Sequence, residues 1–150
     1  MRGMRTIAAP LIGMALALAA SNAVARNVSY KLPIADALAN TSANNPLAGF
    51  AFNWADQKPT GSFTDLGVLL IGKGKARIAH RAEEMACREA FLDALQSLRQ
   101  QVTSAGGNAA ISVMSDFKGH SFESRTHYDC HAGHADVYVT LKGTAARITP

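Results

Sequence analysis

The chain has 150 residues, of which 48% are hydrophobic and 17% charged, and its formal net charge at pH 7 is +4. This length corresponds to one domain that can bury a substantial core. The weak positive balance does not indicate a nucleic-acid-binding protein, so we expect no nucleic acid among its partners.

The first 25 residues are typical of a secretory signal peptide. Arg2 and Arg5 form a positive region, residues 7–20 are apolar, and residues 23–25 form a cleavage site of small residues. The apolar stretch is shorter than the ~20 residues that a transmembrane helix needs, and no later apolar run is long enough. We therefore predict a periplasmic or secreted protein whose mature chain, residues 26–150, has no membrane span and a formal charge of +2.

The first half of the mature chain predicts short elements separated by polar loops. Alternating residues predict a strand over 28–32, and Pro33 favours a short helix over 34–39. Residues 40–46 and 56–62 have the polar, Pro- and Gly-containing composition of loops. Between and after them, residues 50–54 and 66–71 are predicted strands.

The longest predicted element is an amphipathic helix that begins near Ala82 and ends at Gly106 and Gly107. Its apolar positions are three and four residues apart: Cys87, Phe91, Ala94, Leu95, Leu98 and Val102. The elements that follow are a buried strand over 109–114, a turn around Gly119, and a strand over 135–141 with residues 143–148 as its extension past a glycine bend. This order predicts one α+β domain over 26–150, with one long helix packed on a small, mainly antiparallel sheet.

Two cysteines, Cys87 and Cys130, remain in the mature chain. An even count in an oxidising compartment favours one disulfide between them. Two buried free thiols or a metal site are the alternatives that the sequence leaves open.

Catalytic motifs are incomplete in this sequence. Residues 67–74 approach a P-loop, but Gly74 stands where Mg²⁺ binding needs Ser or Thr, and the four residues before Gly72 are aliphatic, as in a strand. Ser121, His127 and Asp129 could be named as a hydrolytic set, yet no nucleophile elbow surrounds the serine. A basic run from Lys73 to Arg81 is interpreted as a solvated strand end. We therefore predict that the protein is not an enzyme.

A histidine cluster offers another chemistry, because four of the five histidines lie within fifteen residues: His120, His127, His131 and His134. Imidazole is a suitable ligand for zinc or copper. The spacing of the histidines matches no zinc motif. Their side chains could meet at one metal ion only if the chain bends near Gly133. If these histidines bind a metal, we expect it to be Zn or Cu. We expect no other cofactor.

Several short runs, which include both cysteines, carry a resemblance to a known family: residues 32–38, 56–58, 86–87, 90–95, 106–109, 129–133 and 141–143. They resemble a family of small exported proteobacterial proteins commonly labelled "excinuclease ATPase subunit". Residues 82–148 are also loosely similar to the Rcs outer-membrane stress-sensor lipoprotein and to YbjQ-like proteins. That resemblance implies a helix over a small sheet, with disulfide support.

These observations predict a non-enzymatic protein with a binding or envelope-sensing role, whose partner is an envelope protein or ligand. The alternative function is a periplasmic metal-binding protein that uses the histidines of residues 120–134.

Overall fold

A computed structural model describes residues 25–39, 41 and 45–149 of the chain. The predicted signal peptide, apart from Ala25, and most of the predicted loop over 40–46 lie outside the described residues. The elements are β1 (Val28–Pro33), α1 (Ile34–Ala39), β2 (Ala51–Trp54), β3 (Phe63–Arg77), α2 (Glu83–Ser104), β4 (Ala109–Phe117), β5 (His120–Phe122), β6 (His127–Ala132) and β7 (Asp136–Ile148).

An α+β fold is present, but the predicted arrangement of one long helix on a small, mainly antiparallel sheet is wrong. The described chain is mostly β, with 46% strand and 23% helix, and it forms a curled, mixed sheet of seven strands. The prediction failed because it followed apolar runs. Strand β3 has 15 residues and β7 has 13, since both continue through polar residues that face solvent.

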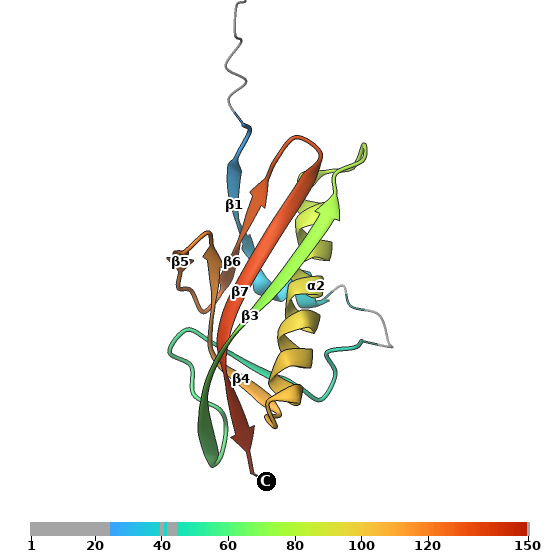
Figure 1. The fold of residues 1–150 in the computed structure, drawn as a ribbon. Coiled ribbons are helices and arrows are strands. Elements are labelled where there is room, and N and C mark those ends of the chain that lie inside the picture. The colour runs from blue at the N-terminus through green and yellow to red at the C-terminus, as the bar shows by residue number, and fades with distance from the viewer. Residues whose placement is uncertain (1–24, 40, 42–44, 150) are drawn as a thin grey trace, which may run out of the picture.

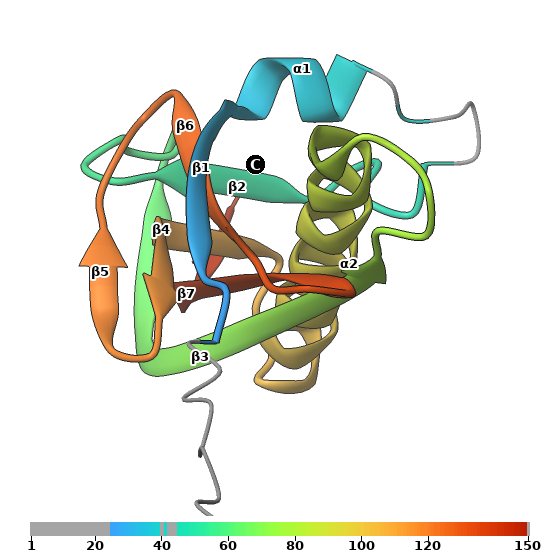
Figure 2. The ribbon, with the colours of Figure 1, turned by 90° about the horizontal axis from the view of Figure 1, so that it is seen from above.

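Strand β7 is the centre of the sheet (Figure 1). It pairs antiparallel with β3 along almost its whole length. Its other edge pairs with β6 near Val137 and with β4 from Leu141 onward. Strand β1 extends the sheet from β6, whereas β5 and the parallel strand β2 both pair with β4. Strand β7 thus has two neighbours, β6 and β4, along one edge. The sheet curls around α2, as Figure 2 shows.

The predicted apolar face of α2 is confirmed. Its side chains have no exposed surface at Cys87, Phe91, Ala94, Leu95, Leu98 and Val102. The ring of Phe91 stacks between Trp54 of β2 and Tyr128 of β6, at centroid distances of 5.8 and 4.0 Å. The predicted glycine stop is also confirmed, since Gly106 has a φ of 83° and so takes the left-handed conformation that ends helices.

The backbone of α2 lies directly on β3 at two glycines. A Cβ atom added to Gly74 would stand 1.7 Å from the carbonyl oxygen of Ala90, and one added to Gly72 would stand 2.3 Å from that of Ala94. Only glycine permits such an approach of two backbones. The glycines that resemble a P-loop in the sequence are therefore strand residues that contact the helix.

We predict that Gly74→Ala lowers the free energy of unfolding by ~3 kcal/mol or more, because the clash is with backbone and cannot be relieved by rotating a side chain. The matched control is Lys73→Ala, one residue away on the opposite, exposed face of β3, with an expected change within ~0.5 kcal/mol. Urea unfolding followed by circular dichroism measures both. Equal midpoints for the two variants would show that the helix does not contact the strand here.

Candidate functional site

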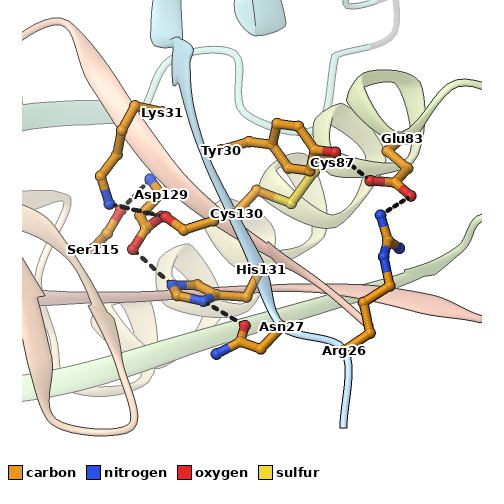
Figure 3. Close-up of a disulfide and its surroundings, with 11 residues drawn as sticks. Arg26, Asn27, Tyr30, Lys31, Glu83, Cys87, Ser115, Asp129, Cys130 and His131 are labelled. Carbon is orange, nitrogen blue, oxygen red and sulfur yellow. Dashed lines mark hydrogen bonds and ion pairs between the residues drawn. A yellow bond between two sulfur atoms is a disulfide. The ribbon is translucent and has the colours of Figure 1, made fainter. Parts of the chain in front are cut away.

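The predicted disulfide is present. Cys87 of α2 and Cys130 of β6 are bonded, with Sγ atoms 2.04 Å apart, and both residues are fully buried (Figure 3). The bond joins the helix to the sheet beneath it. Neither cysteine is free, which removes both as metal ligands.

Strand β1 is tied to the start of α2 beside this disulfide. Glu83 accepts a hydrogen bond of 2.5 Å from the Tyr30 hydroxyl and forms an ion pair of 2.7 Å with Arg26. The hydrogen bond from Tyr30, together with Arg26, lowers the pKa of Glu83 despite some opposing desolvation. These contacts hold the amino-terminal strand against the helix.

Asp129 and His131 flank Cys130 and point away from the helix (Figure 3), because alternate residues of a strand face opposite sides. Asp129 is only 6% exposed. One oxygen of its carboxylate accepts hydrogen bonds from Ser29 at 2.6 Å and Lys31 at 2.8 Å, and the other lies 2.7 Å from Nε2 of His131. Its backbone N–H donates to Ser115 Oγ at 2.9 Å.

The environment of Asp129 keeps its carboxylate ionised. Burial raises the pKa, but the hydrogen bonds from Lys31, Ser29 and His131 together outweigh burial, and the pKa lies below its usual value. The carboxylate therefore joins β1 to β6 through charge-assisted hydrogen bonds.

His131 is held on three sides. Its Nε2 contacts Asp129, its Nδ1 lies 3.1 Å from Oδ1 of Asn27, and its ring stacks on Phe117 at a centroid distance of 3.7 Å. Phe117 belongs to the end of β4, so this stack connects the polar cluster of β1 and β6 to the β4–β5 hairpin.

The four predicted metal ligands are not brought together. His120 is exposed on β5, His127 begins β6, and His134 is exposed in the turn before β7. His127 contacts the neighbouring Thr126 hydroxyl at 2.8 Å. Within the described part of the chain, no group of three or more His, Cys, Asp or Glu residues could hold a metal ion.

The residues named as a hydrolytic set are also engaged elsewhere. Ser121 Oγ donates to Asp116 at 2.9 Å and accepts a hydrogen bond of 2.5 Å from Lys142. Asp129 contacts His131 rather than His127. The geometry therefore does not assemble a serine nucleophile with a histidine base.

A surface depression on the outer face of the sheet, opposite α2, is the feature that the sequence did not reveal. It has a volume of about 590 Å³ and lies between strands β3 and β7 and the β4–β5 turn. Its lining includes Lys73, Lys75, Phe117, Lys118, Tyr138 and Thr140. The alternation of Lys73, Lys75 and Arg77 was a usable signal for one cationic strand face, but the turn that closes the depression comes from a distant part of the chain.

The lysines around the depression differ in their partners. Lys75 forms an ion pair of 3.1 Å with Asp136, and the hydrogen bond to that carboxylate raises the pKa of Lys75. Lys118 lies over the ring of Phe117, with its Nζ 5.3 Å from the centroid.

Lys73 has no hydrogen-bond or ion-pair partner among the described residues, and Lys118 has no acidic one. One carboxylate, Asp116, also lines the depression, and it pairs with Lys142 at 3.4 Å. The three lysines of the lining therefore leave an excess of positive charge.

Comparisons with family models, with curated proteins and with solved structures find no match to this chain. The family resemblances drawn from short sequence runs thus stay predictions. In the described part of the chain, no helix has the length and apolar character needed to cross a membrane.

We predict that native protein yields no alkylated cysteine and a mass two hydrogens below that of the reduced chain. The Cys87→Ala/Cys130→Ala variant should lose ~4 kcal/mol of stability, because the bond closes a loop of 43 residues in the unfolded chain. Intact-mass spectrometry and urea unfolding check these results. Labelling of both thiols without denaturant would contradict them.

We predict that Asp129→Asn loses ~1–3 kcal/mol of stability at pH 7, since Lys31 and His131 lose a charged acceptor. The folded-state pKa of Asp129 is depressed, so its stabilisation is complete above the unfolded pKa of about 4 and is lost as pH falls through the folded value. Urea midpoints of wild type and variant, measured at pH 7 and pH 3, should therefore lie closer together at pH 3 than at pH 7.

The exposed Glu123 supplies the control for this experiment. Glu123→Gln should change stability by less than ~0.5 kcal/mol at both pH values. A difference between wild type and Asp129→Asn that stays constant from pH 7 to pH 3 would contradict the assigned role of the carboxylate.

Proposed function

We propose that this protein is a non-enzymatic, exported binding protein that holds an anionic ligand in the depression on the outer face of its sheet. One observation carries the proposal: Lys73 and Lys118 face a depression of about 590 Å³ without an acidic partner among the described residues. Ammonium groups that are not neutralised by the protein favour a carboxylate or phosphate group as ligand.

The rest of the lining favours a ligand that has an apolar part in addition to its negative charge. Tyr138 is 38% exposed, and Phe117 and Ile71 add apolar surface beside the Thr140 hydroxyl. Binding sites typically combine such apolar area with a few polar groups that orient the ligand. A ligand with an apolar body and negative groups fits this composition.

A binding or envelope-sensing role is favoured over catalysis by the contacts of the nearby titratable groups. Asp129 and His131 contact each other and residues of β1, so they serve to hold strands together. The disulfide supports an oxidising compartment, in agreement with the predicted signal peptide.

Titration with inorganic phosphate, followed by two-dimensional NMR of the mature protein, tests the proposal. We expect shifts confined to amides around Lys73, Lys118 and Thr140, with weak, millimolar affinity that falls as NaCl is added. Lys73→Ala should weaken phosphate binding at least about fivefold, which corresponds to ~1 kcal/mol.

Lys58→Ala is the matched control, because Lys58 is also exposed but lies in the loop between β2 and β3, outside the depression. Its phosphate affinity should equal that of the wild type. Shifts spread evenly over all lysine-rich segments, or equal effects of the two substitutions, would refute the site.

A further inference from the structure

We propose that the ligand is a linear acidic polysaccharide that lies along strand β3. This inference rests on the proposed anion site and extends it, because the positive charge continues beyond the depression. Lys73, Lys75 and Arg77 are exposed on one face of β3. The residues that alternate with them, Gly72, Gly74 and Ala76, are buried, and the two glycines lie against α2. Alternate residues of a strand project on one side at intervals of ~7 Å, so the three cations form a straight row.

The row is longer than the depression. Lys73 and Lys75 line the depression, but Arg77 does not. Lys118 stands on the opposite wall, and Lys142 of β7 lies across from Ile71 of β3. A single small anion could reach only part of this surface, whereas a chain with repeated charges could contact all of it.

The charge on this face is not neutralised by the protein. Its two carboxylates each pair with one lysine: Asp136 with Lys75 at 3.1 Å and Asp116 with Lys142 at 3.4 Å. Lys73, Arg77 and Lys118 have no acidic partner among the described residues. The surplus is three positive charges, which exceeds the formal charge of +2 of the predicted mature chain. The positive charge of the mature protein is thus concentrated on this face of the sheet.

The aromatic side chains favour a sugar polymer over a nucleic acid. Single-stranded nucleic acids bind by stacking bases on free aromatic faces. Here the Phe117 ring stacks on His131 at 3.7 Å and also lies beneath Lys118, and the Tyr138 ring lies beneath Lys75 at 5.5 Å. The Thr140 hydroxyl in the lining suits the hydroxyl groups of a sugar. An exported protein would also encounter acidic polysaccharides at the cell surface.

The test compares galacturonate with hexagalacturonate by calorimetry on the mature, disulfide-bonded protein at low salt. We expect the hexamer to bind at least about 10-fold more tightly per carboxylate than the monomer, because one chain contacts several cations at once. Arg77→Ala should weaken hexamer binding about fivefold and leave phosphate binding unchanged, since Arg77 lies outside the depression. Arg77→Lys should retain most of the affinity, and thermal unfolding verifies that both variants fold.

Two charge-matched probes, hexaglutamate and a seven-nucleotide thymidine strand with six phosphodiesters, identify the polymer class. Weaker binding of both supports a polysaccharide, whereas equal or tighter binding of either one overturns it. A hexamer that binds no better per carboxylate than the monomer also overturns this inference, even if the phosphate site persists. If neither phosphate nor hexamer binds, the proposed anion site itself falls.

Discussion

The approach of α2 to β3 at Gly72 and Gly74 is the constraint on which the rest of the structure depends. Because no side chain separates the two backbones, the helix packs against the strand at a distance that only glycine allows. This contact places the apolar face of α2 over β3 and β7, and the large side chains of the helix, such as Leu95 and Leu98, are then fully buried in the core between helix and sheet. An added methyl group on β3 would force the helix away from this core.

The same contact decides what the opposite face of β3 presents to solvent. With glycine at alternate positions on the helix side, Lys73, Lys75 and Arg77 all point outward. Pairing with β7 places Thr140 beside Lys73 and Tyr138 beside Lys75. The alternating sequence of β3 therefore has two consequences. Its glycines allow the helix to pack on one face, and its cations form a row on the other.

Strand β6 repeats this division between its two faces. Cys130 points inward and bonds to the helix, while Asp129 and His131 point outward and hold β1. The stack of His131 on Phe117 then fixes the β4–β5 hairpin that forms one wall of the depression. The disulfide and the polar cluster thus join α2, β1, β6 and the β4–β5 hairpin, and such cross-links would favour the proposed binding by a preformed surface.

The sequence alone determined two local features, the buried face of α2 and its glycine stop, because helical periodicity and the backbone freedom of glycine depend on neighbouring residues only. The even cysteine count favoured a disulfide between Cys87 and Cys130, and the tertiary structure decided it by placing the two side chains together. Only the tertiary structure decided the extent of the sheet, the parallel pairing of β2 with β4 and the dispersal of the histidines. Strand pairing joins residues far apart in the chain, so the depression between Lys73 and Lys118 exists only once β3, β7 and the β4–β5 turn have met.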